Sequence, residues 1–143
     1  MVFARIASMT KGLPPDEGTL SFELKNDLAE MPVLVEQVES FCERQGIGPE
    51  VVSVVNLALE EIVTNIISYG YADEEDHRIS VGLAHDGANL TACVEDDAKA
   101  FDPPQVEAPE IGLGLHLVRT LMDEVTYSRE RDRNVLRIRK AMA

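Results

Sequence analysis

The sequence predicts an α+β fold, a two-layer sandwich in which helices cover one face of a mostly antiparallel sheet. Three observations favour this class. Short segments with period-two alternation of apolar and polar residues occur near the start, the middle and the end of the chain. Two longer segments between them carry apolar residues every three or four positions, and an Asp-Gly pair separates two strand-like segments. Hairpins combined with segregated helices are typical of an α+β sandwich.

The first half of the chain yields one strand and two helices. Residues 19–26 alternate as TLSFELKN, which is the pattern of a half-buried strand. Residues 27–45 have the apolar spacing of an amphipathic helix that ends before Gly46. A second helix is expected over 49–69, because proline suits a first helical position and Gly70 suits the exit.

The second half alternates strands with one loop and one helix. We expect strands over 77–85 and 89–95, joined by the Asp-Gly turn. Residues 96–110 contain prolines and many charges, so they predict a long loop, a candidate lid. A helix after Gly114 and two strands, near 124–129 and 134–139, complete the chain.

Size and composition indicate one domain. A chain of 143 residues with 45% hydrophobic residues can bury a core without disulfides or metals. Residues 1–17 have little periodicity and are expected to form an N-terminal arm or loop, and residues 18–143 a single domain. The net charge of −13 argues against nucleic acid as the main partner. With no signal-like segment and no apolar run near the roughly 20 residues that span a bilayer, we expect no membrane association and a cytoplasmic location.

The cysteines and histidines carry no predicted chemistry. Cys42 and Cys93 lie in apolar segments without metal-ligand or redox spacing, so they are expected to be small buried residues. His77, His85 and His116 also lack metal-ligand spacing. The sequence therefore predicts no metal site built from protein ligands alone.

The second predicted helix carries a candidate polar pair. Glu61 and Asn65 are one turn apart at the border of the apolar face, where a carboxylate can accept a proton and an amide oxygen can bind a hard cation. An isolated pair of this kind on a helix more often has a structural role, through surface exposure or a local hydrogen bond. Glu60 is predicted on the solvent side, in a group with Ser53, Asn56 and Thr64.

Two further segments could hold a ligand. In VEDDAKAFD, Asp96 follows an apolar strand and can accept a hydrogen bond from an exocyclic amine, although turn-forming aspartates and a core role for Phe101 are alternatives. In IGLGLHLV, Gly112 and Gly114 allow close backbone approach directly before a helix, which suits a phosphate. That segment has neither the dinucleotide nor the P-loop fingerprint, and a plain helix start remains an alternative.

Taken in order, EEIVTN, VEDDAKAFD, GLGLHLVRTLMDEV and NVLRIRK resemble the bacterial anti-sigma factor serine kinases of the RsbW type, in the GHKL (histidine kinase-like) ATPase superfamily. The resemblance spans roughly residues 19–141 and implies the GHKL (Bergerat) sandwich. By this resemblance Glu61 is the catalytic base, Asn65 the Mg²⁺ ligand and Asp96 the residue that reads the adenine amine. The segment that wraps the phosphates corresponds to Gly112, Leu113, Gly114 and Leu115, and Ala98 and Phe101 belong to the adenine side of the pocket.

The resemblance also implies a biochemical role. Similar proteins bind ATP and Mg²⁺, phosphorylate a serine or threonine of a STAS-domain anti-anti-sigma protein, and sequester a sigma factor, commonly as homodimers. Two departures from the family pattern are visible. Ala98 replaces the glycine that is usually found two residues after the adenine-binding aspartate, and Ile111 replaces a glycine that often precedes the phosphate-wrapping segment. A methyl group at 98 would crowd the nucleotide if that backbone needs positive φ. A nucleotide-binding regulatory module without kinase activity, or an acidic interaction domain without nucleotide, are the alternatives.

Overall fold

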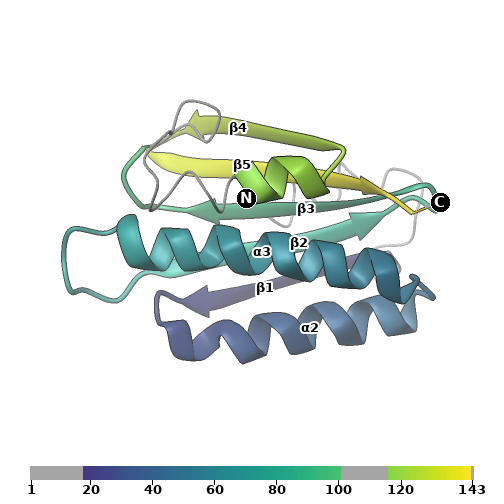
Figure 1. Cartoon of the computed structure of the whole chain (residues 1–143). Coiled ribbons are helices and arrows are strands. Elements are labelled where there is room, and N and C mark those ends of the chain that lie inside the picture. The colour runs from purple at the N-terminus through teal and green to yellow at the C-terminus, as the bar shows by residue number, and fades with distance from the viewer. Residues whose placement is uncertain (1–17, 101–115, 143) are drawn as a thin grey trace.

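A computed structural model describes residues 18–100 and 116–142 of the chain (Figure 1). It contains one five-stranded sheet in the order β1-β2-β3-β5-β4, and every neighbouring pair is antiparallel. The strands are β1 (Thr19–Lys25), β2 (Arg78–His85), β3 (Asn89–Asp96), β4 (Glu124–Glu130) and β5 (Arg133–Ala141). The predicted arm at 1–17 lies outside the described residues.

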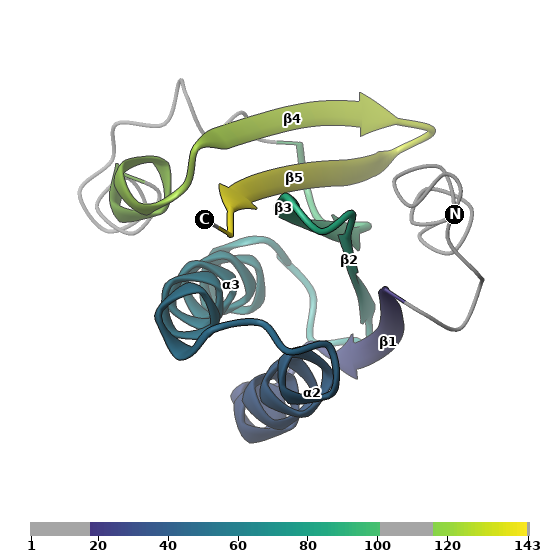
Figure 2. The same cartoon turned by 90° about the vertical axis from the view of Figure 1, so that its right-hand side faces the viewer.

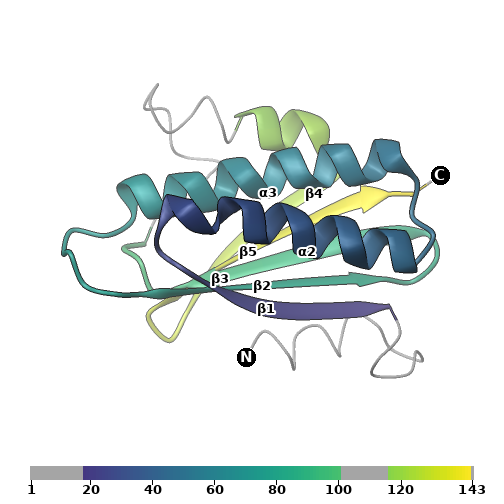
Figure 3. The same cartoon turned by 90° about the horizontal axis from the view of Figure 1, so that it is seen from below.

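The helices lie on one face of this sheet (Figures 2 and 3). They are α2 (Met31–Arg44), which follows a 3-10 turn over Leu28–Glu30, α3 (Pro49–Tyr69), and a short helix whose described part is 116–121. The α+β two-layer sandwich is therefore confirmed, and each predicted strand and helix is present with ends shifted by a few residues at most.

Helix α3 is the central element of the helical layer. Pro49 stands in its first turn and the helix ends against Gly70, as the sequence predicts. The helix has 21 residues, and an 18-residue window within it has a mean hydropathy of 1.5, so it has the length and composition of a membrane span. In this fold its residues 55–66 instead supply the middle of the core, where Leu59 and Val63 are fully buried.

One prediction for α3 is wrong. Asn56 was expected on the solvent side, yet only 7% of it is exposed. The reason is that α3 packs both on the sheet and on α2, so more than one side of the helix is covered. A helical wheel that assumes a single buried stripe misses the second contact.

The two cysteines are small buried residues, as predicted. Cys42 and Cys93 each have no exposed surface and form no disulfide. Burial raises the pKa of the Cys42 thiol to about 11. Because the thiolate is the reactive form, Cys42 is an inert core residue at neutral pH.

The end of α3 is held tightly against the chain that leaves β3. The N–H of Lys99 donates to the carbonyl oxygen of Gly70 over 3.1 Å. A Cβ added at Gly70 would lie 2.8 Å from the Cβ of Ala98 and 2.5 Å from the carbonyl oxygen of Ile66. Gly70 is therefore required by close packing, although its own φ of −80° is one that any residue adopts.

We expect Gly70→Ala to lower the free energy of unfolding by about 1–3 kcal/mol, the usual cost of forcing a methyl group into a packed site. Urea unfolding followed by circular dichroism measures the change. Gly48→Ala is the control for steric crowding, because a Cβ there meets nothing within 4 Å, and its loss should be limited to the weaker preference for alanine at the N-cap of the same helix. Equal losses in the two variants would contradict the steric explanation.

Candidate functional site

Asp96 is the last residue of β3 and only 2% of it is exposed. Its Oδ1 accepts hydrogen bonds from the N–H of Ala98 at 2.9 Å and from Nδ2 of Asn134 at 2.8 Å. Its Oδ2 receives no hydrogen bond from the residues that the structure describes. Burial raises the pKa of this carboxyl, while the two donors and the charge of Arg133 partly oppose the shift. Asp96 is thus a buried carboxyl with one oxygen fixed by the protein.

Asn134 joins three segments around this carboxyl. It stands opposite Asp96 in the pairing of β3 with β5, and its Nδ2 also lies 3.0 Å from the carbonyl oxygen of Lys99 and 3.2 Å from that of Ala98. Its Oδ1 accepts from the Tyr127 hydroxyl at 2.6 Å and from Nη1 of Arg129 at 3.1 Å. Sequence reasoning missed this group. The sequence signal that could have identified Asn134 is its position as the polar first residue of the predicted strand NVLRIRK.

The methyl group of Ala98 points toward the end of α3. Ala98 is 3% exposed, and its Cβ is the side-chain atom nearest to the position where Gly70 would carry a Cβ. Among the described non-glycine residues, positive φ occurs at Arg131 and Asp132 and not at Ala98. The strain that a glycine-requiring backbone would impose is therefore absent at this position.

Asn65 brings a second buried polar group from α3. Only 9% of it is exposed, and its buried Nδ2 has no hydrogen-bond partner among the described residues. It lies five residues before Gly70, which is about 7.5 Å along the helix axis. A buried amide without a partner is costly in a folded protein, so such a group indicates a role beyond packing.

Glu61 and Glu60 face different surroundings. Glu61 is half-buried and stands one turn before Asn65 on the same side of α3. Glu60 instead lines a groove of about 410 Å³ together with α2 residues, among them Met31, Val35 and Glu39. The two neighbouring carboxylates are not equivalent, which agrees with their different positions on the predicted helix.

The remaining predicted site residues lie outside the described parts of the chain. They are Phe101, Gly112, Leu113, Gly114 and Leu115, together with the departure at Ile111. The described part of the short helix, 116–121, follows them in the chain and lies on the same face of the sheet as α3 (Figure 3). Its Val118 is fully buried in the core, so the start of this helix is anchored to the domain.

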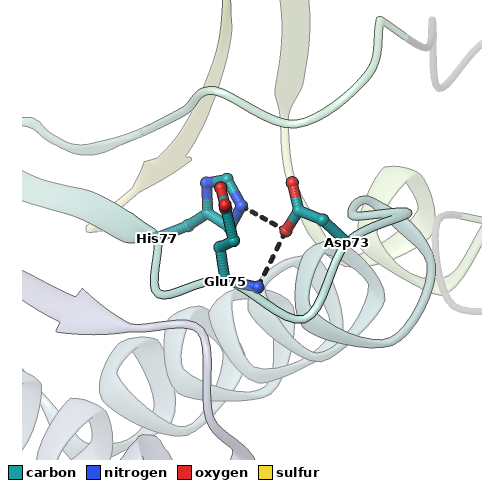
Figure 4. Close-up of side chains that lie close together, drawn as sticks. All are labelled: Asp73, Glu75 and His77. Atoms are coloured by element: carbon teal, nitrogen blue, oxygen red, sulfur yellow. Dashed lines mark hydrogen bonds and ion pairs between the residues drawn. The ribbon is translucent and has the colours of Figure 1, made fainter.

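A polar cluster that the sequence did not predict lies between α3 and β2. Figure 4 shows Asp73, Glu75 and His77, whose ligand-type atoms lie within 4.8 Å of one another. His77 Nε2 is 2.7 Å from Asp73 Oδ1, and its Nδ1 is 3.2 Å from Asp97 Oδ2. The Tyr71 ring stacks on the imidazole with centroids 4.0 Å apart, and its hydroxyl donates to Asp97. The cluster therefore holds the residue next to Asp96 in place.

His77 is expected to titrate above the ordinary value of about 6.5. Its hydrogen bond with Asp73 is the main cause of the raised pKa, and Asp97 adds to the shift. Because the pKa of His77 is higher in the folded state than in the unfolded state, its interaction with Asp73 stabilises the fold fully at pH values below the unfolded pKa. This stabilisation is lost as pH rises through the folded pKa. An NMR titration of the imidazole measures this, and Asp73→Asn should lower the pKa. An unchanged midpoint in that variant would contradict the assigned cause.

Comparisons with known proteins identify the family of this chain. The family described as histidine kinase-like ATPase domain matches residues 24–140. Serine-protein kinase RsbW of Listeria innocua is 29% identical over 124 residues, which cover 77% of this chain and 78% of that protein. RsbW of Oceanobacillus iheyensis is 27% identical over 61% of this chain and 64% of that protein, so the match spans slightly less than two thirds of this relative. An anti-sigma F factor of Clostridium novyi is 31% identical over 53% of this chain and 60% of that protein.

Solved structures share the fold. A Mycobacterium tuberculosis structure of RsbU and RsbW domains superposes with a TM-score of 0.68 at 18% identity, covering 85% of this chain and 31% of that one. A blue-light activated histidine kinase of Erythrobacter litoralis gives a TM-score of 0.59 at 17% identity, over 80% of this chain and 41% of that one. The family match covers most of the described domain, including Glu61, Asn65 and Asp96. This chain therefore belongs to the histidine kinase-like ATPase family.

Proposed function

We propose that this protein binds ATP with Mg²⁺ and transfers the γ-phosphoryl group to a serine or threonine of a partner protein. The observation that carries the proposal is a pair of buried polar residues with unused hydrogen-bonding capacity. Both hydrogen bonds that Asp96 accepts from the described residues go to Oδ1, and the buried Nδ2 of Asn65 has no partner among those residues. They belong to two elements that meet where Gly70 contacts Ala98 and Lys99. A ligand that carries an amine at one end and a phosphate-bound cation at the other would use both side chains.

At the base end of the pocket, Asp96 would accept a hydrogen bond from the exocyclic amine of adenine. Oδ1 is already taken by Ala98 and Asn134, so Oδ2 is the oxygen available to the ligand. A hydrogen bond to an ionised acceptor contributes about 1.5–3 kcal/mol. The burial that raises the pKa of Asp96 also strengthens this contact, because water does not compete for the acceptor.

At the phosphate end, Asn65 would hold the magnesium ion through its amide oxygen. Its Nδ2 has no hydrogen-bond partner among the described residues, so a half-turn about the last side-chain bond can bring the amide oxygen to where the nitrogen lies. An amide oxygen is a suitable ligand for this hard cation. Mg²⁺ neutralises charge on the transferred phosphoryl oxygens when it is bound. We propose that Gly112, Leu113, Gly114 and Leu115 wrap the phosphates.

Glu61 would act as the general base. It accepts the proton of the partner's hydroxyl while that oxygen bonds to the γ-phosphorus and the bond to the β-phosphate oxygen breaks, which yields ADP and a phosphorylated partner. A half-buried carboxylate one turn before Asn65 is close to the proposed phosphate end without being part of the core. Phosphoryl transfer depends mainly on such positioning and on charge stabilisation.

For the partner, we propose a STAS-domain anti-anti-sigma protein as substrate and a sigma factor or other regulator as the output, with a cytoplasmic location and a homodimer as the assembly. The names of two relatives, serine-protein kinase RsbW and anti-sigma F factor, support the part of this proposal that concerns a serine kinase and a sigma factor. The net charge of −13 favours a protein partner over nucleic acid.

The proposal is tested by incubating the chain with ATP, Mg²⁺ and STAS-domain proteins encoded by the same genome, followed by phosphosite mass spectrometry. We expect one serine or threonine of one partner to be phosphorylated. ATP binding without transfer to any of them would favour the nucleotide-binding regulatory module instead. Calorimetry without heat, together with an unshifted melting temperature, would refute the nucleotide site.

A further inference from the structure

The amide of Asn134 can take only one orientation in this structure. Arg129 has hydrogen-bond donors and no acceptor, so the Asn134 atom that lies 3.1 Å from its Nη1 must be the oxygen. The Tyr127 hydroxyl donates to the same oxygen at 2.6 Å. The Nδ2 of Asn134 is thereby directed toward β3 and the segment that follows it.

Of the acceptors around this nitrogen, the carboxylate of Asp96 is the nearest. Asp96 Oδ1 lies 2.8 Å away, compared with 3.0 Å for the Lys99 carbonyl and 3.2 Å for that of Ala98. The N–H of Ala98 is the second donor to Oδ1. Two donors on one oxygen fix the plane of the carboxyl group, and they leave Oδ2 as the only oxygen that a ligand can use.

We infer that Asn134 is a positioning residue that prepares Asp96 to accept a hydrogen bond from the exocyclic amine of a purine, and so contributes to adenine recognition through another side chain. The inference rests on the proposed ATP site and adds to it a residue on β5. The chain Arg129, Tyr127, Asn134 and Asp96 connects the outer hairpin of the sheet to the base end of the pocket.

The charges around Asp96 make this role measurable. Burial raises the pKa of the carboxyl, and the hydrogen bond from Asn134 is the largest opposing influence, followed by the Ala98 N–H and the charge of Arg133. The neighbouring carboxylate of Asp97 raises the pKa further. Tyr71 also lies close enough for the Asp96 charge to influence its hydroxyl. Loss of Asn134 removes the main stabiliser of the ionised form, so ATP binding should weaken at a higher pH than in the native protein.

The test compares ATP with purine riboside triphosphate, which has a hydrogen where ATP has the exocyclic amine. For Asn134→Ala we expect the Kd for ATP to rise about tenfold, which corresponds to the loss of one hydrogen bond to a charged group. The Kd for the analogue should change less than about twofold, because the missing amine removes the contact that Asn134 prepares. The midpoint of the low-pH loss of ATP binding should also move upward in this variant.

A milder variant covers the case in which Asn134→Ala does not fold. Tyr127→Phe removes one of the two donors that orient the amide and should weaken ATP, but not the analogue, about two- to threefold. Thr126→Ala, an exposed position on the same strand, is the control and should bind both nucleotides normally. The positioning role alone would be overturned if the Kd values for ATP and for the analogue rose equally. It would also be overturned if neither Asn134→Ala nor Tyr127→Phe changed the Kd for ATP. Failure of the native protein to bind ATP would overturn the proposed function and this inference together.

Discussion

Glu61→Gln is expected to reduce phosphoryl transfer by about 100- to 10,000-fold, the usual contribution of a general base. The substitution keeps the size and hydrogen-bonding shape of the side chain but removes its ability to accept the hydroxyl proton. Affinity for ATP should change little, because we expect adenine to be bound by Asp96 and the magnesium ion by Asn65. Single-turnover transfer of radiolabelled phosphate to the partner measures the rate, and calorimetry measures the affinity.

The matched control for this experiment is Glu60→Gln. Glu60 precedes Glu61 in the chain but lines the groove shared with α2, so its substitution should leave the transfer rate within about twofold. Undiminished transfer by Glu61→Gln would remove Glu61 from the mechanism. Equal loss in both variants would indicate a general effect of charge on α3 and would contradict the assignment equally well.

Asp96→Asn is expected to raise the Kd for ATP about 30-fold, from the loss of a charged acceptor for the adenine amine. The amide oxygen of the new residue can still accept from Ala98 and Asn134, and its NH₂ group would then face the amine of the base. Two donors facing each other cannot form a hydrogen bond. Calorimetric titration with ATP measures the loss.

Stability should change in the opposite direction in this variant. The pKa of Asp96 is raised in the folded state, so the ionised carboxyl opposes folding at every pH above its unfolded value, and this penalty disappears as pH falls below that value. A neutral amide removes the penalty at pH 7. We therefore expect Asp96→Asn to melt no lower than the native protein while binding ATP weakly. A lower melting temperature with intact binding would contradict both parts.

Much of the fold could be predicted because its signals are local. Pro49 and Gly70 marked the two ends of α3, and the Asp86-Gly87 turn marked the hairpin between β2 and β3. The wrong placement of Asn56 has a tertiary cause, because the contact of α3 with α2 depends on a neighbour that periodicity within one helix does not describe.

The candidate site could be predicted only in part, and the roles of its residues stay predictions. Asp96 and Asn65 were selected from their place at a strand end and a helix border, and both are buried. The side-chain partner of Asp96 was not selected, since Asn134 is 38 residues away in sequence and meets it through strand pairing. The contacts of Tyr71 and His77 with Asp97 were also missed, because Asp97 lies 26 and 20 residues away from them in sequence.

The contact between Gly70 and Ala98 changes how a substitution in a glycine-rich motif should be interpreted. Position 98 can carry a methyl group because position 70 carries no side chain, so the two positions act as one steric unit although 28 residues separate them. If each position of a sequence alignment is considered separately, Ala98 is interpreted as a substitution that impairs the nucleotide pocket. The compensating residue lies in another column, at the end of a helix, and sequences of this family that carry alanine at 98 should retain glycine at 70.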